Sequence, residues 1–208
     1  RDDVRFSDEI LARLMDAYRK IRNTVRYLLS NLYDFDSERC KVKYDDLTDL
    51  DKYILHRMQE VIKESTDAFE NYEFYRFYQI IYNFCVVDLS AFYLDILKDR
   101  MYIYAADSKT RRTGQYVMSE ILVNLTKLLA PVLSYTSEEI WQELRKTSFN
   151  EVTVHLLGWP DVNQKMVNAE IKEKFTEIIK LRNDVLKLLE ELRNNKVIGH
   201  PYEAKVIL

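Results

Sequence analysis

Three arginines and one asparagine recur at helical spacing near the start of the chain: Arg19, Arg22, Asn23 and Arg26. At about 100° per residue, these four residues share one side of a helix. The opposite side collects apolar residues that could enter a core, namely Ile10, Leu14, Ala17, Ile21, Val25, Leu28 and Leu32. A charged stripe opposite an apolar one is usually only a solvated face. Clustered guanidiniums repel one another, however, and are tolerated best where phosphates neutralise them. The pattern therefore favours a helix that packs by one side and binds an anionic partner by the other.

Two other basic stretches are less specific. A second candidate patch, which could equally be a solvated helix start, consists of Lys109, Arg111 and Arg112. A further charged group consists of Lys98, Asp99 and Arg100. An internal ion pair at the predicted turn is at least as compatible with this group as a contact with RNA.

The residue types that usually carry catalysis or hold metals are scattered. His56, His155 and His200 lie far apart and show no ligand spacing. Cys40 and Cys85 form no CxxC pattern, and we expect free thiols in a reducing compartment. The sequence contains no glycine-rich phosphate loop and no nucleophile elbow. We therefore expect no catalytic site, metal site or cofactor in this chain.

Composition indicates a helical protein with limited, local nucleic-acid contacts. The chain has 208 residues, of which 47% are hydrophobic and 31% charged, with only three glycines and three prolines. These values suit long helices and argue against sandwiches, barrels and disorder. A formal charge of −3 excludes bulk attraction to nucleic acid, so any binding must come from local patches. No signal peptide and no run of about 18 apolar residues is evident, so we expect a cytoplasmic protein without a membrane partner. A start at Arg1 instead of Met predicts an excised piece of a longer polypeptide.

Periodicity predicts an all-α bundle. We expect helices at about 7–33, 48–71, 73–98, 107–130, from about 136, and 163–194. Capping signals support three of these starts: Ser7, Thr48 with Asp51, and Thr136-Ser137 with Glu138-Glu139. The helix at 73–98 is rich in aromatic residues. These could form a base-stacking platform, but at helical spacing they favour the central core helix, with Phe74, Phe77, Tyr78, Ile81, Phe84, Cys85, Leu89 and Phe92 inside.

Two segments break the helical pattern. Residues 152–157 alternate and are β-branched, which predicts an extended segment anchored by Trp159. Residues 203–208 predict a C-terminal strand without a partner. We expect a bundle domain at 1–160, followed at 161–208 by a long helix and the start of a junction to a further domain.

Several stretches together resemble the isoleucyl-tRNA synthetases, which are class I aminoacyl-tRNA synthetases. The resemblance is carried by Asp3-Val4-Arg5-Phe6-Ser7-Asp8-Glu9-Ile10-Leu11, Tyr18-Arg19-Lys20-Ile21-Arg22-Asn23-Thr24, Leu28-Leu29-Ser30-Asn31-Leu32-Tyr33-Asp34-Phe35 and Tyr93-Leu94-Asp95-Ile96-Leu97-Lys98-Asp99-Arg100-Met101-Tyr102. Leu129-Ala130-Pro131-Val132-Leu133, Thr136-Ser137-Glu138-Glu139-Ile140-Trp141, Val154-His155-Leu156 and Trp159-Pro160 are similar to the wider group that also handles valine and leucine. Met101 and Gly114 depart from the family pattern, which usually has Leu and a small residue such as Ala there.

This resemblance implies a C-terminal anticodon-binding domain of the class Ia type. The parent enzyme would join isoleucine to tRNA with ATP in catalytic and editing domains outside this chain, and a zinc-bearing tail often follows. The implied partners are the anticodon stem-loop of tRNA(Ile) and the rest of the synthetase chain, in a monomer. On this basis Arg19, Arg22 and Arg26 would contact phosphates or bases and Asn23 a base edge. A helical scaffold for protein interactions, without a nucleic-acid role, remains the alternative.

Overall fold

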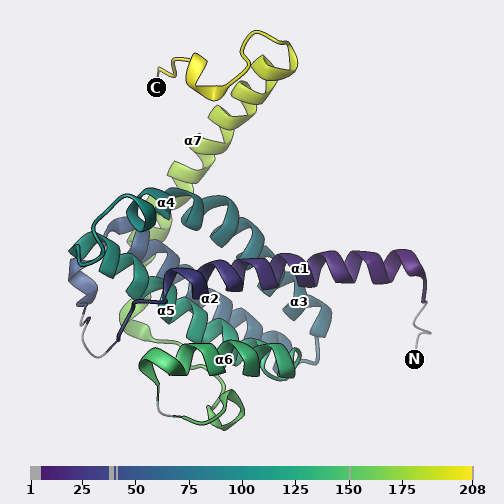
Figure 1. Ribbon diagram of the computed structural model, residues 1–208. Coiled ribbons are helices and arrows are strands. Elements are labelled where there is room, and N and C mark those ends of the chain that lie inside the picture. Colours follow the sequence, from purple (N-terminus) through teal and green to yellow (C-terminus); the bar gives the residue numbers. More distant parts are fainter. Residues whose placement is uncertain (1–5, 38–39, 41, 150, 208) are drawn as a thin grey trace. The chain divides into compact units, whose positions relative to one another are not determined.

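The computed structural model describes residues 6–37, 40, 42–149 and 151–207, and it is all-α over these residues. In chain order the helices are α1 (Asp8–Asn31), α2 (Asp49–Glu70), α3 (Phe74–Asn83), α4 (Leu94–Tyr102), α5 (Lys109–Leu129), α6 (Ser134–Ser148) and α7 (Ala169–Asn194) (Figure 1). A π-helix, η2 (Phe84–Tyr93), joins α3 to α4, and short 3₁₀ turns are η1 (Tyr44–Asp46), η3 (Val154–Leu156), η4 (Gln164–Met166) and η5 (Pro201–Glu203). The chain divides into two compact units, residues 1–167 and residues 168–208.

Side-chain caps fix where the helices of the first unit begin. Ser7 accepts a hydrogen bond from the Ile10 amide, and Thr48 accepts one from the Asp51 amide. These bonds satisfy amides that have no partner within the helix. Ser108 caps α5 in the same way. The predicted starts of these three helices are confirmed.

The core of the first unit lies where α1, α2, η2 and α5 meet (Figure 1). Its fully enclosed large side chains include Leu28, Ile54, Met58, Phe84, Leu89, Tyr93, Met118 and Trp141. Each such side chain contributes about 1.5–3 kcal/mol by leaving water. Trp159 anchors the segment after α6, because its ring packs on Phe69 with centroids 4.9 Å apart and its indole nitrogen donates to Thr66 Oγ1 at 2.8 Å.

Residues 74–102 form one uninterrupted helical rod with π geometry in the middle, which continues four residues beyond the predicted end at Lys98. Phe77, Ile81, Phe84, Cys85, Leu89 and Phe92 are buried, whereas Phe74 is exposed, contrary to prediction, and Tyr78 is half-buried. The Thr24 hydroxyl of α1 lies 3.3 Å from the Cys85 carbonyl oxygen and 2.9 Å from Ser90 Oγ. The π segment therefore meets α1 through polar as well as apolar contacts, and π turns are frequent at functional sites.

The same rod corrects one expectation about hydropathy. By length and composition, the helix from Phe74 to Tyr102 could cross a membrane, although the sequence was expected to hold no apolar run of that length. Its η2 segment instead contacts α1 and α2, and Phe84, Cys85, Leu89, Phe92 and Tyr93 are buried. We interpret the rod as the core helix of the first unit.

Three local predictions are wrong. Helix α6 begins at Ser134, so Thr136 and Ser137 are not its cap; Glu138 instead accepts hydrogen bonds from the Thr153 hydroxyl and the Val154 amide. The extended segment predicted at 152–157 is interrupted by the single 3₁₀ turn η3 (Val154–Leu156), which Thr153 caps. The predicted strand at 203–208 is also absent from its described residues: Glu203 ends η5 and 204–207 have no regular structure, while 208 lies outside the described chain. A strand needs a neighbour to pair its backbone groups, and neither segment has one within the described residues.

The second unit consists of α7 and the turn after it. Asn168 caps α7 by accepting from the Ile171 amide at 3.0 Å, so this helix starts six residues later than predicted. Lys196 adopts φ 56°, and the Val197 amide donates to the Leu192 carbonyl, which closes the end of the helix. Tyr72, with φ 57°, closes α2 in a similar way within the first unit.

Candidate nucleic-acid interface

Helix α1 presents the four residues singled out in its sequence on one open surface, here called the α1 ridge and defined as Arg19, Arg22, Asn23 and Arg26. All four are exposed, while Ile21, Thr24, Val25 and Leu28 on the other side are buried. No ion pair joins the three ridge arginines to a carboxylate within the part of the chain that the structure describes. The ridge is therefore available to an anionic partner.

Two grooves of different character flank the ridge. The groove on the Asn23 side has a volume of about 360 Å³ and lies between α1 and the η2–α4 rod. Val86 and Leu94 form apolar parts of its lining, and Lys20 and Lys98 supply positive charge. Apolar walls with a few polar groups are the usual composition of a ligand pocket, and they suit an unstacked base.

Both lysines of this groove are paired with carboxylates. Lys20 Nζ lies 2.9 Å from Asp16 and donates to the Tyr82 hydroxyl at 3.1 Å, and the hydrogen bond to Asp16 is the main reason that the pKa of Lys20 is raised. Lys98 Nζ donates to Asp95 at 2.8 Å, which likewise raises the pKa of Lys98. Each lysine therefore keeps its proton at neutral pH. The sequence did not single out Lys20, and it left Lys98 open between an internal ion pair and a contact with RNA. The fold brings both lysines next to the ridge.

The groove on the other side of the ridge is acidic. Arg22 and Arg26 line it from α1, and α6 contributes Glu138, Glu139 and Glu143. Hydrogen bonds from Thr153, foremost, and from Gln142 and the Val154 amide lower the pKa of Glu138, so this carboxyl is ionised at neutral pH. Phosphates would be repelled from the floor of this groove. We therefore expect an RNA backbone to lie along the crest of the ridge and its Asn23 side.

The second predicted patch is largely committed to holding the fold together. Arg111 is buried and donates to both carboxylate oxygens of Asp34, at 2.7 and 2.9 Å. Arg112 donates to the Asp34 carbonyl at 2.7 Å and to Gln115. Lys109 pairs with Asp46 at 2.8 Å but remains exposed. The prediction of a tRNA contact therefore finds no support at Arg111 or Arg112, because both guanidiniums join α5 to the segment that follows α1.

Asp34 is the centre of this junction. Burial alone would raise its pKa, but hydrogen bonds from Arg111 and Gln115 and the charge of Arg112 outweigh burial, and the net pKa is lowered. Gln115 Nε2 also donates to the Asn31 carbonyl at 2.7 Å, which satisfies an open carbonyl at the end of α1. A partner 77 residues away gives no local sequence signal, so these contacts could not be read from spacing.

Arg100 forms the internal ion pair that the sequence left open. Its guanidinium meets both oxygens of Asp51 at 3.0 Å, and Asp51 is fully buried on α2. Tyr93 donates its hydroxyl to the same carboxylate at 2.8 Å. The charge of Arg100 is thus neutralised by Asp51 inside the bundle. Lys98, by contrast, lines the groove beside the α1 ridge.

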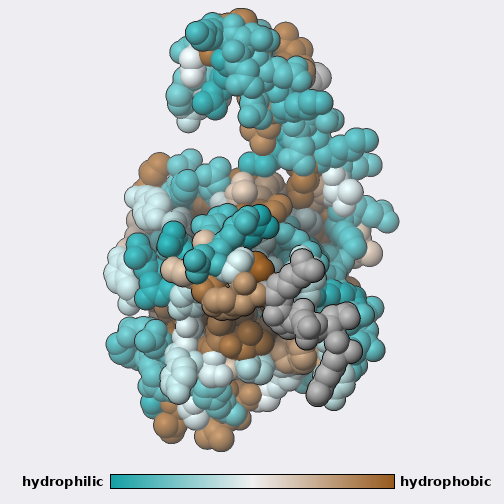
Figure 2. Space-filling view, turned by 90° about the vertical axis from the view of Figure 1, so that its right-hand side faces the viewer, coloured by the Kyte–Doolittle hydropathy of each residue, from teal (hydrophilic) through white to brown (hydrophobic). Residues whose placement is uncertain are grey.

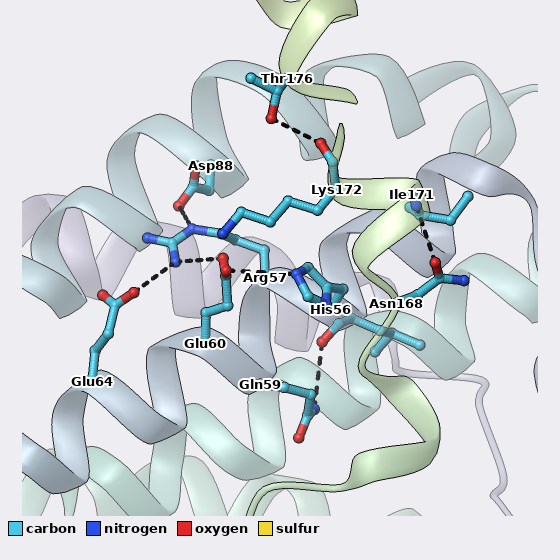
Figure 3. Close-up of polar contacts among 11 residues, drawn as sticks. His56, Arg57, Gln59, Glu60, Glu64, Asp88, Asn168, Ile171, Lys172 and Thr176 are labelled. Atoms are coloured by element: carbon cyan, nitrogen blue, oxygen red, sulfur yellow. Dashed lines mark hydrogen bonds and ion pairs between the residues drawn. The ribbon is translucent and has the colours of Figure 1, made fainter. Parts of the chain in front are cut away.

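A further charged cluster surrounds Arg57 on α2 (Figure 3). Arg57 donates to Asp88 and Glu60 at 3.1 Å each and to Glu64 at 3.4 Å. Burial raises the pKa of Asp88, and the neighbouring charge of Arg57 offsets part of that effect. One guanidinium shared by three carboxylates leaves an excess of negative charge, so this cluster offers nothing to a phosphate. Among the described residues, no group of three or more potential ligands could hold a metal ion.

Comparison with known proteins shows the family to which the chain belongs. Residues 51–208 match the family described as the anticodon-binding domain of tRNA ligase. The chain belongs to this family. An isoleucine–tRNA ligase of Persephonella marina is 48% identical over 208 residues, one of Natranaerobius thermophilus is 46% identical over 208 residues, and one of Thermotoga neapolitana is 42% identical over 207 residues. Each comparison covers the whole of this chain but only 22% of the relative, so the anticodon-binding domain spans about a fifth of these ligases.

A solved structure supports the fold. The ternary LeuRS–tRNA–LeuAMS complex of Agrobacterium radiobacter K84 contains a chain that matches with a TM-score of 0.51 at 20% sequence identity. The match covers 80% of this chain and 18% of the LeuRS chain. The anticodon-binding domain described here thus shares its helical architecture with part of the LeuRS chain.

Proposed function

We propose that this anticodon-binding domain grips the anticodon stem-loop of tRNA(Ile) through the α1 ridge, as part of an isoleucine–tRNA ligase. The parent enzyme would use ATP to join isoleucine to the tRNA in domains outside residues 1–208. Support comes from the family match and from relatives that all carry the name isoleucine–tRNA ligase. In this division of work, the domain described here holds the tRNA and carries out no bond-making step.

One observation carries the proposal: three ridge arginines face solvent without a described carboxylate partner. Ion pairs elsewhere, such as Arg57–Asp88, Lys109–Asp46 and Arg111–Asp34, show that carboxylates of this chain readily pair with cations where the fold brings them together. An uncompensated row of guanidiniums is unfavourable unless a partner neutralises it, and RNA phosphates match the forked donors of arginine.

The groove beside the ridge supports a role in reading sequence as well as binding phosphate. Single-stranded loops are recognised through splayed bases that enter pockets and offer their edges to hydrogen bonding. The Asn23 amide has both a donor and an acceptor, and it lines the groove together with the two lysines. We assign phosphate contacts to Arg19, Arg22 and Arg26 and a base-edge contact to Asn23.

The competing function is a helical scaffold for protein interactions. Such a scaffold would present the same bundle but would not bind tRNA(Ile), even at low salt. The family match favours the tRNA function. Binding of residues 1–208 to labelled tRNA(Ile), with a second elongator tRNA as control, separates the two functions by fluorescence anisotropy.

The salt dependence of the affinity shows how many phosphates the chain contacts. With about three phosphate contacts and a slope of roughly 0.7 to 0.9 per contact, affinity should fall roughly 20- to 40-fold between 50 and 200 mM salt. Reversing Arg22 and Arg26 to Glu should abolish binding. The matched control reverses two exposed lysines away from the ridge, Lys63→Glu with Lys165→Glu, and should retain most of the affinity. Equal losses in both double variants would remove the α1 ridge as the binding surface.

We further infer that the parent acts in the cytoplasm as a monomer, without a membrane partner. We place any zinc of the parent in a tail outside this chain, a proposal that the full-length protein tests; among the described residues no group of three or more potential ligands could hold a metal ion. Light scattering of the full-length ligase tests the monomer, and elemental analysis of full-length and truncated proteins tests the position of the metal.

A further inference from the structure

The apolar stripe of α1 continues past the point where the bundle covers it. Ala17 is the first buried residue of this helix. Ile10 and Leu14, on the same side and predicted to enter the core, are instead 41% and 53% exposed. That prediction is wrong for this chain because no described element lies over the first two turns of α1 (Figure 1). The sequence of the helix is nevertheless patterned for burial over its whole length.

A groove of about 740 Å³ begins where this uncovered stretch meets the bundle. Its walls come from α1, the end of α2, α3 and the turn between α5 and α6, and it has no charged residue among its lining. Its exposed or half-buried lining residues include Leu14, Met15, Tyr18, Phe74, Tyr78 and Val132. Figure 2 shows hydrophobic surface gathered on this side of the molecule. A contiguous apolar surface of this kind marks an interaction site.

One wall of the groove is already held in place. The Tyr18 hydroxyl lies 3.0 Å from Thr136 Oγ1, which ties the start of the groove on α1 to α6. A wall fixed in advance loses less conformational entropy when a partner binds. The surface suits leucine, methionine or aromatic side chains, because the lining offers almost no partner for a charged group.

We propose that this groove and the uncovered first turns of α1 are the docking surface for the polypeptide that precedes Arg1 in the full-length ligase. The inference rests on the proposed function, in which this chain is one domain of a longer enzyme. The relatives are far longer than this chain, which spans only 22% of each. Upstream chain would emerge beside α1 at Asp8, so the tether keeps its local concentration high next to the groove. Docking there would fix the angle between the tRNA-holding domain and the rest of the enzyme.

The experiment uses the full-length ligase without tRNA. Met15→Cys places a thiol on the uncovered stripe, and Leu156→Cys places one on an exposed turn that does not line the groove. Of the native thiols, Cys85 is buried and Cys40 half-buried, and the unmodified protein gives their background. We expect maleimide to modify position 15 at least about tenfold more slowly than position 156, because labelling would require local opening of the docked surface.

A photo-crosslinking residue at position 15 identifies what covers the groove. The inference requires adducts with peptides that precede Arg1 in the same molecule. Adducts between two molecules would overturn it in favour of a self-associating surface, and equal labelling at positions 15 and 156 would overturn it outright. tRNA binding by the same variants is measured separately. If maleimide labels position 15 as fast as position 156 while tRNA binding is intact, only the docking inference is refuted. If position 15 is protected from maleimide but the protein does not bind tRNA, only the proposed function is refuted.

Discussion

Breaking the buried ion pair between Arg100 and Asp51 tests whether Arg100 is structural or an RNA contact. Both oxygens of Asp51 are occupied: Oδ1 accepts from Tyr93 and Arg100, and Oδ2 accepts from Arg100 and Thr48. Arg100→Met would leave a fully buried carboxylate with only the two hydroxyl donors. Asp51→Asn would instead leave a guanidinium that still donates to the Thr110 carbonyl and the Thr113 hydroxyl and reaches solvent in part.

The expected loss of stability differs between the two variants because the residue left behind keeps different partners in each. Removing one partner of a buried pair costs about 3–5 kcal/mol, chiefly because the other charge loses its compensation. Arg100→Met should lie at that level and lower the Tm by roughly 6–20 °C for a chain of this size. Asp51→Asn should cost less, since Arg100 keeps two other acceptors. Because the two residues interact directly, the double variant should cost less than the sum of the two single changes.

Urea unfolding followed by circular dichroism gives the free energies, and anisotropy with tRNA(Ile) gives the affinity of each folded variant. We expect Arg100→Met to lose stability while its tRNA affinity and salt slope stay unchanged. The reasoning is refuted if Arg100→Met retains full stability yet weakens tRNA binding, or if Asp51→Asn proves the more destabilising of the two.

Three further predictions concern packing and titration. A methyl group added at Gly114 would sit 3.0 Å from Met101 Cε, the end of a flexible side chain that can move by a few tenths of an ångström. Alanine favours the interior of α5 over glycine by about 1 kcal/mol, so Gly114→Ala should stabilise the domain by up to about that amount in urea unfolding, and a clear loss of stability would show that Met101 cannot move. Because the pKa of Asp34 is lower in the folded chain than its unfolded value near 4, its ionised carboxylate stabilises the fold above about pH 4, and this stabilisation is lost as pH falls through the folded-state pKa. Asp34→Asn should therefore make the free energy of unfolding depend less on pH in the acid range. An unchanged pH dependence would contradict the role of Arg111. Burial raises the pKa of Glu120, so ionisation disfavours folding; Glu120→Gln should stabilise the domain at pH 7 but not at pH 3, as checked by thermal unfolding at both values.

The helices, and the polar starts of α1, α2 and α5, could be predicted because they depend on residues three or four apart. Thr48 and Asp51 cap α2 through contacts within one turn. The π geometry of η2 could not be foreseen, since its aromatic and aliphatic residues also fit an α-helical period. The exposure of Ile10 and Leu14 at the start of α1 was not predicted, for a different reason. Their apolar spacing indicates a buried helix face, but no described segment of this chain covers that face.

In the candidate site, too, features set by local spacing could be predicted and those set by distant partners could not. Exposure of the α1 ridge follows from helical periodicity, which places its arginines opposite the core. The fate of Arg111 depends on Asp34, which comes from another helix end and is close only in the folded chain. The acidic groove beside Arg22 likewise arises from α6, more than a hundred residues away. Charge neutralisation between distant segments is a property of the fold and leaves no trace in local spacing.

The central claim is that the uncompensated arginines of α1 hold tRNA(Ile) by its phosphates. The most direct measurement is the salt dependence of tRNA(Ile) affinity for the unmodified chain, for Arg19→Gln and for Arg26→Gln. Each neutral variant should lower the slope of log affinity against log salt by about 0.7 to 0.9, the contribution of one phosphate contact. Slopes identical to that of the unmodified chain in both variants would contradict the account.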